Sequence, residues 1–182
     1  MKTVYLVRHA SATGQPTSAS LTEQGRRQAI ALVDFFKHKE VNIIYSSPFK
    51  RAVDTIKPLS DVRNINIVKD SRLGERVLSS VSFEDWRDKL KQSFEDFDLV
   101  FEGGESHTAA MERAKSILED VLCSPEENIV LVSHGNMSTL LMRYFNENFG
   151  YDCLMEMTNP DVFEIVVSNE ETILNRIWDD RI

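Results

Sequence analysis

The sequence is poor in cysteine, has no long apolar run, and has fewer bases than acids. Its two cysteines, Cys123 and Cys153, lack the spacing of metal or redox motifs. Two isolated thiols are typical of a reducing cytoplasm, and we expect both to be packing residues. The longest uninterrupted apolar run, from Ala29 to Val33, is far shorter than the ~20 residues that span a bilayer. A membrane-spanning protein is therefore not expected.

The charge balance excludes two further classes of partner. The 182 residues include 29 acids and 21 bases, which gives a formal net charge of −8. Nucleic acids and anionic membrane surfaces bind cationic faces, so neither is expected as a partner. Only Val4 to Val7 is apolar before Arg8, which is too short for the apolar region of a signal peptide. We therefore expect a cytoplasmic globular protein, whose 42% apolar residues suffice for a core.

Strand-like and helix-like segments alternate along the chain. Apolar, β-branched segments predict strands at 3–7, 41–45, 65–68 and 129–132, with a closing hairpin at 162–167 and 172–178. Apolar residues at helical spacing predict helices at 22–38, 49–59, 106–122 and 136–146. The core stripe of the first helix comprises Ala29, Ile30, Leu32, Val33 and Phe36. The fold class is α/β: a three-layer sandwich with a mostly parallel mixed sheet, helices on both faces, and 129–132 as a central strand.

Residues 76–102, called the insertion below, interrupt this alternation within one domain that covers residues 1–182. Aromatic and apolar residues recur in it at helical spacing: Phe83, Trp86, Leu90, Phe94 and Phe97. They indicate either a helix packed on the body or a flap over a site, with aromatic rings that form core or an apolar wall for a ligand. The insertion also carries acids, namely Glu84, Asp85, Asp88, Glu95, Asp96, Asp98 and Glu102. We expect them to be solvated, since acids turned toward an anion site would repel its ligand.

Charged and aromatic side chains follow three of the predicted strands. Arg8-His9-Ala10 ends the first, Ser133-His134-Gly135 ends the central one, and Ser46-Ser47-Pro48 leads into a helix whose first turn contains Arg51. In open α/β sheets, ligands bind outside the carboxyl ends of the strands. An arginine near the positive end of a helix dipole is either a solvated surface residue or a ligand for a bound anion.

With these motifs the sequence resembles the histidine phosphatase superfamily, which includes the cofactor-dependent phosphoglycerate mutases. The similar segments occur in the family's order over nearly the whole chain: Arg8-His9-Ala10 for Arg-His-Gly, Leu21 to Ala29 for Leu-Thr-x-x-Gly-x-x-Gln-Ala, Ser46 to Thr55 for the second arginine motif, Leu73-Gly74-Glu75 for Leu-x-Glu, Gly104-Glu105-Ser106, and Ser133-His134-Gly135. Each segment is weakly specific alone, but their shared order makes a chance match improbable.

The resemblance implies roles for the matched residues. His9 would be the nucleophile that takes the phosphoryl group, while Arg8, Arg51 and His134 would surround the phosphate. Glu75 would protonate the leaving group and then help to activate water. The alternative for Glu75 is a surface ion pair with Arg72 or Arg76. The implied mechanism uses no cofactor and no metal, and the surrounding cations are expected to lower the pKa of His9.

The sequence departs from the family at two positions near the first motif. Ala12 and Gln15 stand where the family often has Thr and Asn, and only Gln15 retains a hydrogen-bonding side chain. Ser11 or Thr13 would have to replace the Thr. We expect Ser11, Gln15 and Gly135 to contact the substrate beside the residues named above.

Three other polar residues have simpler interpretations. Ser106 precedes a predicted helix and is expected to be its N-cap, with a phosphate contact as the alternative. His38 and His107 are expected to lie on the surface.

The resemblance leaves more than one activity open. The short chain favours hydrolysis of a small phosphorylated metabolite over a phosphoglycerate mutase, although Asn136 is also typical of mutases. Phosphatases that act on phosphoproteins lack the acid that Glu75 represents. A non-catalytic phosphate-binding module would be expected to have lost His9, His134 or an arginine. The expected partner is thus a small phosphorylated substrate, and the oligomeric state is not predicted.

Overall fold

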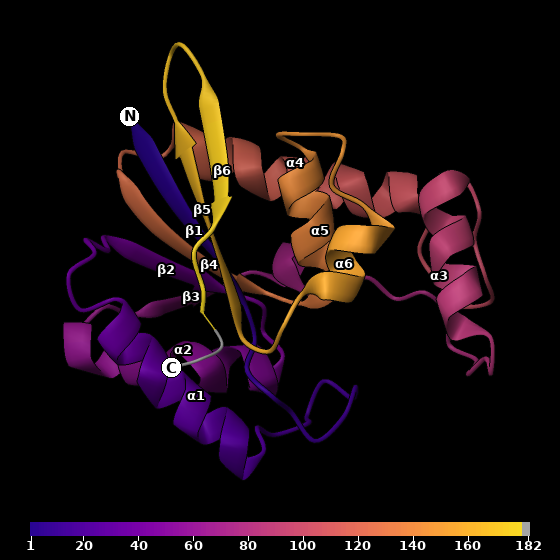
Figure 1. Cartoon of the computed structure of the whole chain (residues 1–182), viewed down its shortest axis with the longest axis horizontal. Coiled ribbons are helices and arrows are strands. Elements are labelled where there is room, and N and C mark those ends of the chain that lie inside the picture. The colour runs from indigo at the N-terminus through magenta and orange to yellow at the C-terminus, as the bar shows by residue number, and fades with distance from the viewer. Residues whose placement is uncertain (180–182) are drawn as a thin grey trace.

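A six-stranded sheet forms the centre of the computed structural model, which describes residues 1–179 (Figure 1). The strands are β1 (Lys2–Arg8), β2 (Ile43–Ser46), β3 (Ile67–Lys69), β4 (Asn128–Ser133), β5 (Asp161–Val167) and β6 (Thr172–Arg176), in the order β3-β2-β4-β1-β5-β6. The pairs β1–β4, β2–β4 and β2–β3 are parallel, whereas β1–β5 and β5–β6 are antiparallel. The predicted mixed sheet and its central strand are therefore confirmed.

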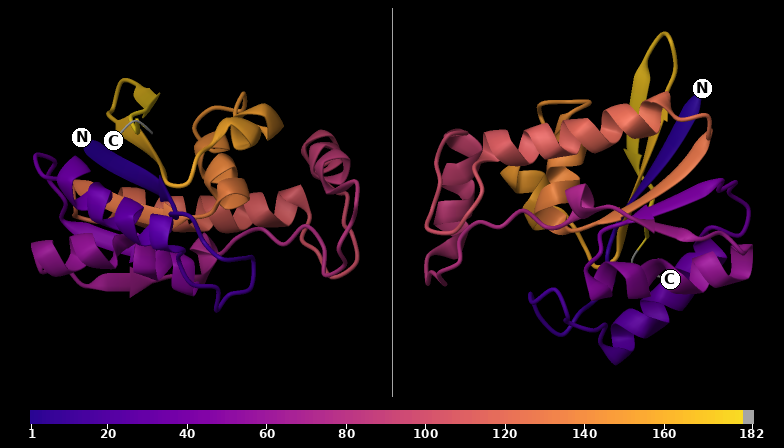
Figure 2. Two further views of the ribbon diagram at one scale, coloured as in Figure 1. Left: turned by 60° about the horizontal axis from the view of Figure 1, so that its bottom comes forward. Right: turned by 180° about the vertical axis from the view of Figure 1, so that it is seen from behind.

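Helices cover both faces of this sheet because the side chains of its strands alternate in direction. Tyr5 and Val7 belong to one core with α1 (Glu23–Phe35) and α2 (Lys50–Arg63). Val4 and Leu6 belong to the other with α4 (His107–Cys123) and α5 (Gly135–Arg143). Two views in Figure 2 show the resulting three layers, as predicted. None of the helices within residues 1–179 is long and apolar enough to cross a bilayer.

Two helices begin where the sequence indicates. The Thr22 hydroxyl accepts a hydrogen bond from the Gly25 amide (2.9 Å), and the Ser106 hydroxyl accepts one from the Ala109 amide (3.0 Å). Both residues are therefore N-caps. The first helix ends at Phe35, earlier than predicted, and Ile30 is 60% exposed rather than part of its core stripe.

Other boundaries differ more. The helix α2 continues past the predicted end at Leu59 to Arg63, with Pro58 inside it, and its C-cap Asn64 has the left-handed conformation (φ 55°). The sequence did not predict η1 (Ser71–Leu73), a single 3₁₀ turn, or α6 (Tyr151–Glu156). A helix of six residues is too short to show a helical repeat of apolar residues, so periodicity cannot reveal it.

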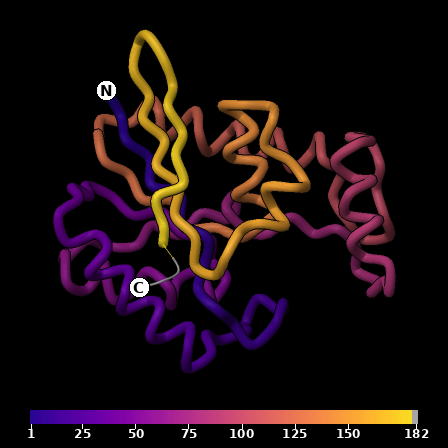
Figure 3. Tube along the Cα trace, in the orientation of Figure 1, coloured from indigo at the N-terminus to yellow at the C-terminus, as the bar shows by residue number. Residues whose placement is uncertain are grey.

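The insertion projects beyond one end of the sheet. Its helix is α3 (Trp86–Glu95), which lies apart from the sheet in the ribbon views and in the tube of Figure 3. Its two ends pair with each other, because the Ser80 amide donates to the Glu102 carbonyl and the Glu105 amide to the Val77 carbonyl, both at 2.8 Å. The acids of the insertion are all exposed, as expected.

Two further expectations about burial were wrong. Cys123 is exposed rather than a packing residue. His107 is 2% exposed rather than on the surface, and its ring stacks on Phe97 with centroids 4.0 Å apart. His107 stands three residues before Ala110 and seven before Ala114, so it continues the buried stripe of α4, and this spacing could have predicted its burial. His38 is exposed, as expected.

The two-faced core leads to a stability prediction. Leu131 is fully buried in β4, whereas Ile30 is mostly exposed on α1. We expect Leu131→Ala to lower the free energy of unfolding by about 2–5 kcal/mol, because it removes buried methyl groups and leaves a cavity. The matched variant Ile30→Ala should change it by less than about 0.5 kcal/mol. Urea denaturation of both variants measures the difference, and equal losses would contradict this account of the core.

Candidate functional site

The two histidines after β1 and β4 lie side by side because the two strands are parallel neighbours in register. Arg8 is paired with Ser133, so His9 and His134 follow at the same edge of the sheet. The His9 amide continues the ladder by donating to the Ser133 carbonyl (3.0 Å). The ring centroids of His9 and His134 are 5.1 Å apart, in an edge-to-face arrangement.

Hydrogen bonds define the tautomer of His9. Its Nδ1 lies 2.7 Å from the Ala10 carbonyl oxygen, which can only accept, so Nδ1 carries the proton. The Nε of Arg51 donates to Nε2 of His9 (3.2 Å), so the lone pair is on Nε2. Burial lowers the pKa of His9 to about 4, and the neighbouring charges of Arg51 and Arg8 lower it as well. His9 is therefore a neutral imidazole near pH 7 with a lone pair at the site.

Hydrogen bonds between side chains and the backbone hold His9 and Arg51 together. The Asn159 side-chain amide donates to the His9 carbonyl (2.8 Å). The Ala10 amide donates to the Thr55 hydroxyl (2.9 Å), which donates to the Arg51 carbonyl (2.7 Å). The loop after β1 is thus bound to the first turn of α2, and the His9 ring and the Arg51 guanidinium are fixed relative to each other.

Arg51 is 1% exposed, which excludes the interpretation as a solvated surface residue. Its Nη1 donates to the carbonyls of Gln15 and Pro16, both at 3.0 Å. Burial lowers the pKa of Arg51, while the charge of Glu75 opposes this shift, and none of the ion pairs among the described residues includes Arg51. A buried cation at the start of a helix makes this point of the site strongly electropositive.

Arg8, the last residue of β1, is held by a backbone carbonyl and lies close to Gly135. Its Nη1 donates to the Met157 carbonyl (3.0 Å). A Cβ on Gly135 would come within 3.0 Å of the Arg8 guanidinium carbon and 2.9 Å of Leu154 Cδ1, so a larger residue there would require these side chains to shift. Burial lowers the pKa of Arg8, while the nearby carboxylate of Glu75 opposes the shift.

His134 is buried and fixed by the Ser47 hydroxyl, which lies 2.8 Å from its Nε2. Its ring also packs edge-to-face on Phe49, with centroids 4.8 Å apart. Burial together with His9 and the arginines lowers the pKa of His134 to about 2. Its Nδ1 has no hydrogen-bond partner, so this neutral ring retains one unused polar atom.

The carboxylate of Glu75 lies against the first turn of α5 and is not part of a surface ion pair among the described residues. Its carboxylate accepts hydrogen bonds from the amides of Arg76 (2.8 Å), Met137 (2.9 Å) and Asn136 (3.2 Å). Arg72 pairs instead with Asp70 and Asp120. Burial raises the pKa of Glu75, although the three amides and Arg8 favour the charged form. Glu75 is thus a carboxyl with enhanced affinity for a proton.

A salt bridge stabilises the loop that carries Glu75. Arg113 of α4 forms two 2.8 Å hydrogen bonds with the Glu105 carboxylate. The same guanidinium donates to the carbonyls of Arg72 (2.9 Å) and Gly74 (2.8 Å). Glu105, from the Gly-Glu-Ser motif, therefore acts through Arg113 on the backbone beside Glu75.

A cavity of about 660 Å³ opens onto these residues. Residues on its wall that the motifs identified are Arg8, Gln15, Arg51, Glu75 and Gly135. His9 and His134 contact these residues but are not on the wall, and neither is Ser11. The Ser11 backbone is bound to Gln28 and Thr22, and its predicted contact with substrate stays a prediction.

The motifs gave no site role to the rest of this wall, although Trp86 was one candidate for an apolar wall and Asn136 was noted as typical of mutases. Its other members are Pro16, Thr17, Phe49, Arg76, Val77, Leu78, Ser79, Trp86, Leu90, Asn136, Leu154 and Met155. Of the insertion's aromatic residues only Trp86 is among them; Phe83 packs on Phe101, and Phe97 stacks on His107. Leu154 and Met155 come from α6, whose existence the sequence did not indicate.

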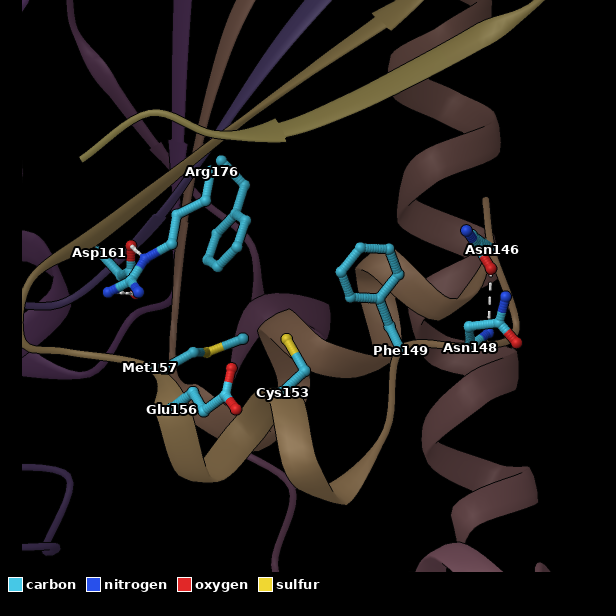
Figure 4. A pocket seen from close by; sticks show the side chains of 9 residues that line it. Asn146, Asn148, Phe149, Cys153, Glu156, Met157, Asp161 and Arg176 are labelled. Carbon is cyan, nitrogen blue, oxygen red and sulfur yellow. Dashed lines mark hydrogen bonds and ion pairs between the residues drawn. The ribbon is translucent and has the colours of Figure 1, made fainter. Parts of the chain in front are cut away.

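A second cavity, of about 350 Å³, lies beside α6 (Figure 4). Phe149, Cys153 and Met157 line it, next to the ion pair between Arg176 and the buried Asp161. None of the motif residues lines it within the described part of the chain. It therefore does not belong to the histidine site, although the Met157 carbonyl binds Arg8.

Known proteins resemble this chain over most of its length. It is 29% identical over 150 residues to phosphoserine phosphatase 1 of Hydrogenobacter thermophilus, covering 74% of this chain and 71% of that protein. It is 30% identical over 196 residues to putative phosphoserine phosphatase 2 of the same organism, covering 96% and 94%. A structure of mycobacterial glucosyl-3-phosphoglycerate phosphatase shares the fold, with a TM-score of 0.77 at 19% identity over 96% of this chain and 97% of that one.

The family comparison agrees with the motifs. The model of the histidine phosphatase superfamily (branch 1) matches residues 4–180, and therefore nearly the whole sequence. The chain belongs to this superfamily and is a phosphatase of the histidine phosphatase family.

Proposed function

We propose that this phosphatase hydrolyses small phosphomonoesters through a phosphohistidine formed on His9. The observation that carries the proposal is the neutral ring of His9, whose Nε2 lone pair faces Arg51 in an electropositive site. An unprotonated imidazole nitrogen is a nucleophile at neutral pH without a metal. Relatives described as phosphoserine phosphatases support a small substrate.

In the first step, His9 Nε2 attacks phosphorus in line with the ester oxygen. The N–P bond forms, the P–O bond to the alcohol breaks, and Glu75 transfers its proton to the departing oxygen. Arg8 and Arg51 offer paired N–H donors to the equatorial phosphate oxygens. His134 adds one N–H donor from the ring nitrogen that carries its proton. Neither this step nor the hydrolysis that follows requires a redox partner.

In the second step, water attacks the phosphohistidine. Glu75, now a carboxylate, accepts a proton from the water as the P–N bond breaks and inorganic phosphate leaves. The pKa of Glu75 is already raised in the free protein, which supports its role as an acid. The charge of a bound dianion raises it further. His9 returns to its neutral form and Glu75 to its acid form.

A panel of phosphomonoesters assayed with EDTA tests the proposal against its alternatives. Phosphate release from several esters, unaffected by EDTA, supports metal-free hydrolysis. The panel includes 3-phosphoglycerate with and without its bisphosphate, because transfer between positions without phosphate release would instead indicate a mutase. Absence of any turnover would favour a phosphate-binding module.

The nucleophile is tested by His9→Ala. We expect the loss of the phosphohistidine and a fall in kcat of at least about a thousandfold, because no other group replaces the attacking nitrogen. Labelling with radioactive substrate followed by an alkaline quench, in which phosphohistidine is stable, and steady-state assays measure the two effects. The exposed His38→Ala is the control and should retain full activity. Activity of His9→Ala near that of the control would exclude His9 as the nucleophile.

The acid is tested by Glu75→Gln, which retains an oxygen for the amides of Arg76 and Met137 and loses mainly the longer contact to Asn136. We expect kcat for alkyl phosphates to fall about 10²–10⁴-fold, since a poor leaving group needs the proton. An activated aryl phosphate should lose less than about tenfold. The control is Glu84→Gln, on the exposed face of the insertion. Equal losses on both esters would argue against proton donation.

The tautomer and low pKa of His9 are tested by proton NMR of the imidazole, assigned by comparison with His9→Ala. An ordinary histidine titrates near pH ~6.5. Burial, Arg51 and Arg8 disfavour the imidazolium, so the midpoint of the His9 titration should lie near pH about 4. A midpoint near the ordinary value would contradict the geometry described for this ring.

A further inference from the structure

The cavity beside His9 has a wall that the proposed phosphate chemistry does not use. Seven of its lining residues are apolar and come from four parts of the chain: Phe49, Val77, Leu78, Trp86, Leu90, Leu154 and Met155. The insertion supplies Val77, Leu78 and the α3 residues Trp86 and Leu90, while α6 supplies the last two. Both elements thus meet across the same cavity into which Arg8, Arg51 and Glu75 open.

Part of this apolar wall is left in contact with water. Val77 is 48% exposed, Trp86 45% and Met155 39%, and all three border this one cavity. Apolar surface in water is unfavourable, and a group of such residues around a cavity is typical of a ligand site. Phe94 and Phe97 of the same insertion instead pack on His107, so not every large apolar residue of the insertion serves this wall.

Besides Arg8 and Arg51, the charged side chains among the described lining residues are Glu75 and Arg76. Glu75 is the one carboxylate among the described lining residues, and the proposed mechanism uses it as the acid. Arg76 is 3% exposed, and its guanidinium donates to Ser93 (3.2 Å) and to the Glu105 carbonyl (3.4 Å). It also lies over the ring of Phe94, 5.9 Å from the centroid, so its charge is directed into the insertion.

We propose that the preferred substrates are phosphomonoesters of uncharged alcohols that carry an apolar group of aromatic-ring size, which binds between Trp86 and Met155. This inference rests on the proposed hydrolysis at His9 and assigns the substrate class of the same site. The phosphate lies with the arginines, and the apolar part of the alcohol covers the exposed wall of α3 and α6. A zwitterionic alcohol such as serine would bring two charges against a wall whose other polar side chains, those of Gln15, Thr17, Ser79 and Asn136, are uncharged, at a cost in desolvation.

Two esters of primary alcohols test the preference while keeping the chemistry of the leaving group similar. We expect kcat/KM for 2-phenylethyl phosphate to exceed that for phosphoserine by at least about tenfold, since a buried ring gains about the energy of several methylenes. If phosphoserine is the better substrate or equal, the inference is overturned while hydrolysis at His9 stands. If neither ester is hydrolysed and p-nitrophenyl phosphate is not hydrolysed either, the proposed function fails and this inference fails with it.

The role of the wall itself is tested by Trp86→Ala. It should lower kcat/KM for 2-phenylethyl phosphate by about tenfold and change that for ethyl phosphate by less than about twofold, because only the larger alcohol reaches the ring. Met155→Ala should act in the same direction. The control is Val100→Ala, an apolar residue of the insertion that is 56% exposed and does not line the cavity. Equal losses on both esters, or the same loss in the control, would overturn recognition by Trp86.

Discussion

The parallel pairing of β1 with β4 is the constraint on which the rest of the site depends. Because Arg8 is in register with Ser133, the chain leaves both strands at the same height and His9 meets His134 edge to face. The neighbouring β2 ends beside them, so Ser47 reaches His134 and the following helix brings Arg51 to His9. A slip of one residue between the two strands would turn alternate side chains to the other face and separate these groups.

The site concentrates positive charge that takes part in no ion pair among the described residues. Arg8 and Arg51 are held mainly by backbone carbonyls, and burial lowers the pKa of each. Such cations are costly in the free protein and gain most from an anion that accepts several of their N–H groups. Burial, together with these charges, keeps His9 unprotonated, so the features that favour a phosphate also preserve the lone pair on Nε2. Meanwhile the acids of the insertion are exposed, and the net charge of −8 belongs to the exterior rather than to the site.

Residues at strand ends and helix starts could be predicted because their positions follow from local patterns. His9 and His134 could be placed at one edge because each follows a predicted strand, whereas Arg51 had a surface alternative and was assigned to the phosphate by the family resemblance. The N-caps Thr22 and Ser106 followed from their position before apolar repeats. The cavity wall could not be predicted in this way, since it is made by tertiary contacts between segments with no shared pattern. The helix α6 is too short to be periodic, and which aromatic residue of the insertion faces the cavity depends on how α3 is placed.

The short segment around α6 joins substrate preference to phosphate binding. Leu154 lies against Gly135, where a Cβ would displace the Arg8 guanidinium, and Met155 next to it lines the apolar wall. Two residues later the Met157 carbonyl accepts the hydrogen bond from Arg8, and Asn159 holds the His9 carbonyl. A movement of α6 to fit a larger alcohol would therefore shift the supports of Arg8 and His9 as well. The insertion faces α6 from across the cavity but makes none of these contacts, so among the described segments the insertion can vary the wall with less effect on the phosphate-binding residues.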